Sequence, residues 1–255
     1  MTTLIYDCSF EGLLTAVFEV FEYKLSSPKI ISKENYSSEN MFAEIHEVFT
    51  SKEKSERVLN KLELNIGKSG ISQLLKVYLS EREDLEFLIL NAIQKSIKNS
   101  LVNNILQNYA DENILEIAKI NKSINREIHR MHAFVRFEKL KDEVYFSKIE
   151  PDFNVLPLIV KHFKDRYQDQ KWMIFDLKRH YGVTYDLQTV DFFYPETDQL
   201  YNFKKIENLL HEEEIRYQKL WQRYFFKTNI PERKNLKLHY QHVPKRYWKY
   251  LTEKI

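Results

Sequence analysis

Residues 126–137 read REIHRMHAFVRF, and this stretch decides how a helical first part of the chain passes into a sheet. If residues 131–137 are extended, successive side chains point to opposite faces. One face is apolar and consists of Met131, Ala133, Val135 and Phe137. The other face is cationic and consists of His132, Phe134 and Arg136, with Arg130 before it. The pattern predicts a helix end that leads into a strand, with one face in the core and the other on a ligand surface.

The segments after this stretch alternate between strand and helix patterns. A hairpin through Lys141–Asp142 is expected first, then a helix over 154–170 and two strands over 171–187 that are separated near Arg179–His180. A long helix over 198–228 follows. We therefore predict an α+β fold, in which an antiparallel-leaning mixed sheet packs against helices.

The segments before the stretch begin with a strand at 3–7 and a helix at 10–25, for which Ser9 is a suitable N-cap. Residues 26–40 are polar, contain a proline and are expected to form a loop. Residues 41–128 are predicted to be a mainly helical layer or insertion, with a break at IGKSG. The expected organisation is one α+β domain over 1–255, with a basic aromatic tail at 229–255.

Composition excludes several classes of function. Four glycines in 255 residues form neither GxGxxG nor GxxxxGK[ST], so dinucleotide and Walker-type phosphate cradles are absent from the sequence. The single cysteine, Cys8, excludes a disulfide within the chain and any cysteine-based zinc or iron–sulfur site. We expect no cofactor. No apolar run reaches the length of a membrane span, and the expected location is the cytoplasm, with no membrane partner.

Charge is unevenly spread along the chain. Residues 1–124 hold 14 Lys/Arg against 18 Asp/Glu, whereas residues 125–255 hold the other 25 against 19. Within residues 215–255 the counts are 11 basic and 2 acidic, a net charge of +9. This excess favours a polyanionic partner, with nucleic acid first and an acidic protein second. A solvated, lysine-rich helix face is the alternative.

Aromatic residues alternate with these cations, which suits single-stranded or distorted nucleic acid because bases stack on exposed rings. They are Tyr217, Trp221, Tyr224, Phe225, Phe226, Tyr240, Tyr247, Trp248 and Tyr250. Trp221, Tyr224 and Phe225 have helical spacing and are expected in the core. The segment PKRYWKYL, residues 244–251, is expected to be exposed or half-exposed.

Histidines and carboxylates supply a second set of candidates. His129, His132 and His162 can act as acid–base groups, with Glu150 or Asp176 as the orienting carboxylate. Each histidine can instead cap or hydrogen-bond within the fold, and Asp176 can pair with an arginine. Zinc is a weaker interpretation because no HExxH spacing is present, and no metal site is predicted.

Several motifs together resemble one bacterial family. They are YDCSFEGLLTAVFE, HRMHAFVRF, IEPDFNVLPLIVKHFKDRY, WMIFDLKR and a closing LWQRYF with IPERKNLKLHYQHVPKRYWKYLTE. The family consists of uncharacterised proteins described as probable DNA metabolism or DNA repair proteins. Its members are typically encoded beside a radical-SAM partner, and some are fused to a uracil-DNA glycosylase-like domain. The resemblance implies a role on nucleic acid and a radical-SAM partner, without an established reaction. At the position of Cys8 the family pattern has glycine.

The resemblance also points to individual residues in this chain. These are Glu11, Gly12, His129, Arg130, Arg136, Glu150, Pro151, His162, Phe163, Arg166, Trp172, Asp176, Arg179, Arg233, His242, Arg246, Tyr247 and Trp248.

Three hypotheses follow. The first is a DNA-repair accessory protein whose arginines contact phosphates and whose Tyr247 or Trp248 stacks on a base, presenting single-stranded or damaged DNA to the radical-SAM protein. The arginines are Arg130, Arg136, Arg166, Arg179, Arg233 and Arg246. The second is an enzyme acting on a nucleic-acid base or phosphodiester through the histidines and carboxylates. The third is an interaction module whose basic tail docks an acidic protein.

Overall fold

The structure is a computed structural model that describes residues 2–36, 44–98, 104–196, 209–229 and 235–254. Contacts divide the chain into two compact units, Met1–Ile124 and Asn125–Ile255, here called the N-terminal and C-terminal units. Each has its own sheet, and helices pack on both, so the predicted α+β class is confirmed. The single domain expected over 1–255 stays a prediction, because contacts do not measure whether two units unfold together.

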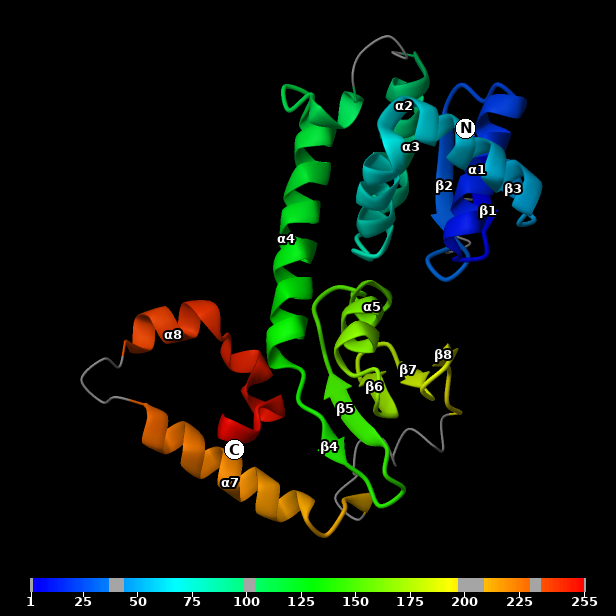
Figure 1. Ribbon diagram of the computed structural model, residues 1–255. Helices are drawn as coiled ribbons and strands as arrows, with labels where there is room; N and C mark the ends of the chain where they lie inside the picture. Colours follow the sequence, from blue (N-terminus) through cyan, green and yellow to red (C-terminus); the bar gives the residue numbers. More distant parts are fainter. Residues whose placement is uncertain (1, 37–43, 99–103, 197–208, 230–234, 255) are drawn as a thin grey trace. The chain divides into compact units, whose positions relative to one another are not determined.

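The N-terminal unit contains a parallel three-stranded sheet in the order β2-β1-β3 (Figure 1). Its strands are β1 (Thr2–Tyr6), β2 (Pro28–Ser32) and β3 (Glu44–Glu47). The loop predicted over 26–40 is therefore wrong at β2. Ile30 and Ser32 are buried there, and the polar residues around them concealed a strand that forms by pairing with β1 rather than by local preference.

The other described elements of this unit are helices. They are α1 (Phe10–Glu22), α2 (Lys52–Tyr78), α3 (Leu85–Lys98), the 3-10 turn η1 (Ile105–Gln107) and the first half of α4 (Glu112–Phe134). The predicted N-cap is confirmed, since Ser9 Oγ accepts from Gly12 N at 2.9 Å. The predicted break is a kink within α2 at Gly67, whose φ of 69° suits a residue without Cβ. Residues 41–128 are mainly helical where described, apart from β3.

Helix α4 corrects the prediction for the opening stretch. It continues to Phe134, so residues 131–134 are helical, and the only strand that follows before the hairpin turn is β4 (Glu138–Lys139). The buried residues Ile117, Ile120, Ile124 and Met131 recur at helical spacing. Strand alternation in 131–137 was a coincidence within this longer helical period, and the two-faced strand predicted there is wrong.

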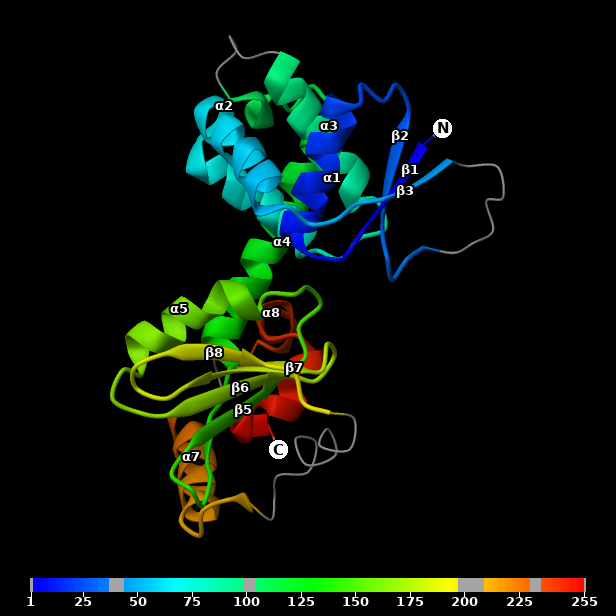
Figure 2. The same ribbon diagram turned by 90° about the vertical axis from the view of Figure 1, so that its right-hand side faces the viewer.

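The C-terminal unit contains a five-stranded mixed sheet in the order β4-β5-β6-β7-β8, of which Figure 2 labels β5, β6, β7 and β8. Its other strands are β5 (Tyr145–Ile149), β6 (Trp172–Asp176), β7 (Tyr181–Tyr185) and β8 (Val190–Phe193). Strands β4 and β5 form the expected hairpin around 141–143, and β6 and β7 are separated where predicted. Only β5 and β6 pair in parallel, so the predicted antiparallel bias holds for this sheet.

Strand β6 is buried on both faces of this sheet. Phe175 packs with Phe146 of β5 on one face. On the other face Trp172 meets Phe163 of α5 (Leu156–Arg166), with ring centroids 6.4 Å apart. Asp176 lies on the same face as Trp172 because strand residues alternate, and it is completely buried. A carboxylate is thereby placed at the end of a central strand.

The C-terminal segment folds onto this unit. The described part of the predicted helix 198–228 is α7 (Glu214–Thr228), and residues 197–208 lie outside the described residues. The tail forms α8 (Leu236–His242) and the 3-10 helices η4 (Lys245–Tyr250) and η5 (Thr252–Lys254). Tyr247 and Leu251 are buried, so PKRYWKYL is partly core rather than exposed throughout. Within the described ranges, no helix is both long and apolar enough to cross a membrane.

Candidate nucleic-acid interface

The segment after β5, residues 150–154, joins three parts of the C-terminal unit. Glu127 of α4 is 1% exposed, and its carboxylate accepts from the Asp152 main-chain N–H at 2.9 Å. The same carboxylate accepts from Arg246 Nη2 at 2.9 Å and from the Tyr247 hydroxyl. Arg246 Nη1 also lies 2.6 Å from Asp152 Oδ2. A buried carboxylate therefore ties both this segment and η4 to α4.

The turn between β6 and β7 holds the same segment from another direction. Asp176 accepts main-chain N–H groups of Lys178 and Arg179 and pairs with Arg179 Nη1 at 2.9 Å. Arg179 then donates to the carbonyls of Pro151 and Asp152. Burial raises the pKa of the Asp176 carboxyl, and the Arg179 guanidinium and the two N–H groups oppose that shift. Asp176 therefore orients Arg179. This is the structural role, pairing with an arginine, that the sequence left open beside the orientation of a histidine.

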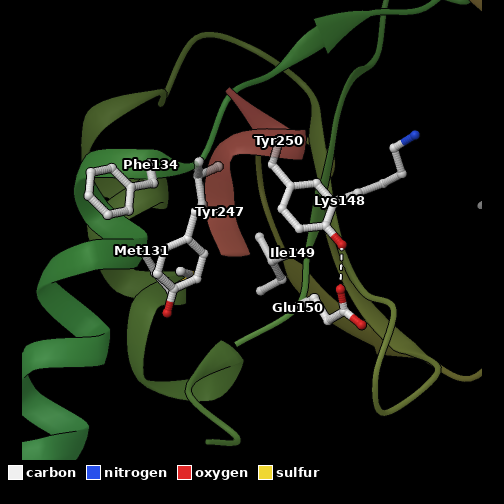
Figure 3. A pocket seen from close by; sticks show the side chains of 8 residues that line it. Met131, Phe134, Lys148, Ile149, Glu150, Tyr247 and Tyr250 are labelled. Atoms are coloured by element: carbon white, nitrogen blue, oxygen red, sulfur yellow. Dashed lines mark hydrogen bonds between the residues drawn. The ribbon is translucent and has the colours of Figure 1, made fainter. Parts of the chain in front are cut away.

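Glu150 connects η4 to the end of β5. Its carboxylate accepts from the Tyr250 hydroxyl at 2.8 Å, a contact drawn in Figure 3, and it pairs with Lys249. The Lys249 ammonium and the Tyr250 hydroxyl hold the pKa of Glu150 below its usual value. Figure 3 also shows Tyr247 beside Met131 and Phe134 of α4, which places its ring in the core.

These contacts build a groove whose walls are mostly cationic. It is lined by Glu150, Pro151, Asp152, Lys178, Lys245, Arg246 and Lys249. Four side chains are basic and two are acidic. Lys178 donates to the Asp152 carbonyl at 3.1 Å, and within the described part of the chain no ion pair involves Lys178 or Lys245. Two ammonium groups therefore line this groove without a carboxylate partner among the residues that the structure describes.

An aromatic pair adjoins the groove. The rings of Tyr240 and Trp248 are stacked, with centroids 5.6 Å apart. Lys245 Nζ lies 4.9 Å from the Tyr240 centroid and Lys254 Nζ lies 5.3 Å from that of Trp248. Tyr240 is exposed and Trp248 half-buried. Cations and ring faces are thus close together, as in surfaces that bind single strands.

The residues predicted to contact nucleic acid are distributed unevenly. Arg246 lines the groove, whereas Arg130 and Arg136 pair with Glu127 and Glu253, and Arg166 is exposed on α5. Arg233 lies outside the described residues.

The side chains of two of these residues are largely buried, and their contact with DNA stays a prediction. The Arg179 side chain is 8% exposed and Tyr247 is 2% exposed, because both serve buried carboxylates. Trp248, which is half-buried, is more accessible than Tyr247.

The predicted catalytic residues do not form one constellation. His132 and His162 stack with centroids 3.9 Å apart and an interplanar angle of 16°. Stacked imidazoles direct their nitrogen lone pairs along parallel planes, which does not suit shared ligation of one ion. Burial lowers the pKa of His132, and the nearby His162 and His129 lower it further.

Glu150 bonds to Lys249 and Tyr250, and Asp176 bonds to Lys178 and Arg179. No hydrogen bond of the described residues joins either carboxylate to a histidine. In the described ranges, no three His, Cys, Asp or Glu side chains gather as a metal-ligand group.

Sequence reasoning named Glu127 only as a carboxylate that could complete a zinc site, and it assigned no role to the groove lysines Lys178, Lys245 and Lys249. Glu127 had a detectable signal, since it lies three residues after Ile124 and four before Met131, on the apolar stripe of α4. A carboxylate in such a stripe requires buried donors. The lysines carried no signal of their own, because only the fold brings 178 beside 245–249.

Comparison with known families places this site within a recognised domain. The family model described as a domain of unknown function, DUF4130, matches residues 83–253, and the chain belongs to that family. No curated protein matches the chain. The whole groove and all of α4 fall inside the matched region, whereas β1, β2, β3, α1 and α2 fall outside it.

Proposed function

We propose that this DUF4130 protein binds nucleic acid in DNA metabolism or repair, with phosphates in the groove of η4 and a base on the Tyr240–Trp248 pair. The observation that carries the proposal is the convergence of Lys178, Lys245, Arg246 and Lys249 on one groove. Single-stranded or damaged DNA suits it best, because unstacked bases can reach the exposed Tyr240 of this aromatic pair.

The construction of the groove supports this function. Glu127 and Arg179 fix the groove wall from inside through buried contacts, so the wall is ordered before a ligand arrives. Preorganised cations lose less conformational entropy on binding than mobile ones. Lys178 and Lys245 have no competing carboxylate partner among the described residues, and we therefore assign phosphate contacts to them first.

A radical-SAM partner belongs to the same proposal and rests on the resemblance of the quoted motifs. In this scheme the protein presents DNA to a second enzyme that carries out the chemistry. Co-expression with a radical-SAM protein of the kind that the resemblance implies, followed by size-exclusion chromatography, tests it. Separate elution of the two folded proteins, both without and with DNA, would contradict it.

Binding itself is tested by fluorescence anisotropy with single-stranded, duplex and uracil-containing DNA at several salt concentrations. Each lost phosphate contact lowers the slope of log affinity against log salt by about 0.7 for single strands and 0.9 for duplex. The Lys178→Ala/Lys245→Ala variant should therefore weaken binding and lower the slope by about 1.4 on single strands.

The matched control is Lys161→Ala/Lys171→Ala, which removes two exposed lysines of the same unit that do not line the groove. It should leave the slope unchanged. Equal effects of the two double variants would mean that binding follows net charge rather than the groove. Replacement of Arg246 is a less specific test, because its guanidinium also pairs with the buried Glu127.

A further inference from the structure

Helix α7 packs against its own unit through polar side chains. Glu214, Gln218 and Gln222 recur at intervals of four and face inward. The Glu214 carboxylate accepts from the Lys139 main-chain N–H at 3.0 Å, and Gln218 Nε2 donates to Glu138 at 3.0 Å. Gln222 Nε2 donates to the Thr252 carbonyl at 3.0 Å. The inward side of this helix is therefore largely hydrogen-bonded, and it also holds the half-buried Phe225, whose ring centroid lies 4.9 Å from Lys254 Nζ.

Next to this inward side, α7 carries a stripe of large apolar residues at positions i, i+3, i+4 and i+7. Their exposed fractions are 56% for Tyr217, 49% for Leu220, 42% for Trp221 and 60% for Tyr224. This corrects the expectation that Trp221 and Tyr224 lie in the core. Helical spacing was predicted correctly, but the apolar stripe faces solvent. An ordinary surface helix has the reverse polarity, and an apolar stripe that faces outward marks an interaction site.

The charges that α7 itself carries after Glu214 are all of one sign, and the Glu253 carboxylate that accepts from Trp221 Nε1 at 3.1 Å belongs to a side chain that is only 7% exposed and pairs with Arg136. Arg216, Lys219, Arg223 and Lys227 lie along one edge of the stripe, and residues 215–228 contain no Asp or Glu. We propose that the α7 stripe docks into an apolar groove of another protein whose rim carries carboxylates. The spacing is that of a helix laid into a groove, where the four apolar side chains are the anchors. The flanking cations would meet the acidic rim and select the partner.

Two other occupants fit the surface less well. Nucleic acid would meet the cations, but Leu220 in the centre of the stripe has no ring on which a base can stack. A second copy of this chain would place one cationic flank near another, and like charges in contact oppose association. An acidic protein groove satisfies both the apolar centre and the cationic edge.

Photocrosslinking followed by a binding measurement tests the proposal. A benzoylphenylalanine replaces Tyr224 in the full chain, expressed in its own cells. The control carries the same group at Tyr109, which is 58% exposed and belongs to the N-terminal unit. Irradiation and mass spectrometry identify the crosslinked molecule, which is then purified and titrated against the unmodified protein.

We expect a protein that crosslinks at 224 and not at 109, and whose binding weakens with salt. Leu220→Ala/Tyr224→Ala should raise its Kd by about 10-fold or more, as loss of central anchors does. Arg223→Glu should raise the Kd as well, while circular dichroism confirms that both variants are folded. Neither residue lines the DNA groove, so DNA affinity should change little in the apolar variant.

Four results would overturn the proposal. They are crosslinks only to DNA or RNA, crosslinks only to a second copy, no crosslink specific to position 224, and a purified partner that binds the folded variants as tightly as the wild type. Because Lys178→Ala/Lys245→Ala tests the groove separately, failure at α7 leaves the proposed nucleic-acid function standing.

Discussion

The change Glu127→Gln tests whether one buried carboxylate holds the C-terminal tail on its unit. Glutamine has nearly the same shape, but it replaces one acceptor oxygen with an NH2 donor. In the wild type both oxygens accept, from Tyr247, from Arg246 at 2.9 Å and from the Asp152 N–H at 2.9 Å. In the variant at least one donor faces another donor in a site that is 1% exposed to water.

The magnitude follows from these contacts. Breaking a buried ion pair by removal of one partner costs roughly 3–5 kcal/mol. Arg246 reduces this cost because it is 39% exposed and keeps its contact with Asp152. We therefore expect the free energy of unfolding of the C-terminal unit to fall by about 2–4 kcal/mol. This is a large part of the roughly 5–15 kcal/mol typical of a domain.

Urea unfolding followed by tryptophan fluorescence measures this quantity. The chain has three tryptophans, at 172, 221 and 248, and all belong to the C-terminal unit. Glu150→Gln is the matched control, since it makes the same substitution in a carboxylate that also binds η4 but is 40% exposed. Exposed ion pairs contribute little to stability, so Glu150→Gln should lower the free energy of unfolding by less than about 1 kcal/mol.

A double-mutant cycle with Tyr247→Phe identifies the contact responsible. Glu127 and Tyr247 are hydrogen-bonded and buried, so their effects should be non-additive by about 1–2 kcal/mol. The reasoning is refuted if Glu127→Gln lowers the free energy of unfolding no more than Glu150→Gln does. Additive effects of Glu127→Gln and Tyr247→Phe would show that the tail is held by other contacts.

Further predictions concern the turn after β1 and the response to acid. In Gly12→Ala the added Cβ would come within 2.1 Å of Asp7 Oδ1. We therefore expect the free energy of unfolding to fall by about 1–3 kcal/mol, measured by thermal unfolding followed by circular dichroism. An unchanged Tm would contradict the geometry. Cys8 has a φ of 64°, where glycine costs less, so Cys8→Gly should not lower the Tm. The folded pKa of Glu150 lies below its ordinary value of 4.5 because Lys249 and Tyr250 donate to it. Its contribution to stability is therefore present above 4.5 and lost as pH falls through the folded value, and Glu150→Gln should flatten the decline of stability in acid relative to the wild type.

The sequence by itself determined the fold class and the elements with a strong local pattern. The α1 stripe with its Ser9 cap, the α5 stripe, and β6 and β7 with their turn were all predicted, because adjacent residues carry the period or the cap. The excess of cations and aromatics after residue 214 was also evident from the sequence. It indicated a binding surface without showing which side chains are exposed.

Tertiary structure decided the elements and sites that depend on distant partners. β2 forms by pairing with β1, and α4 overrides a short strand-like alternation because its helical period is longer. The cationic groove joins Lys178 to Lys245 and Lys249, and Glu127 reaches Tyr247 across 120 positions. The helical period predicted for α7 was correct, but Trp221 and Tyr224 do not point into the core as predicted. Periodicity shows that an apolar face exists, and only the hydrogen bonds to neighbouring elements decide which way that face points. Local sequence determines helices and strands through short-range sterics and capping, whereas burial and charge pairing depend on contacts that chain order does not specify.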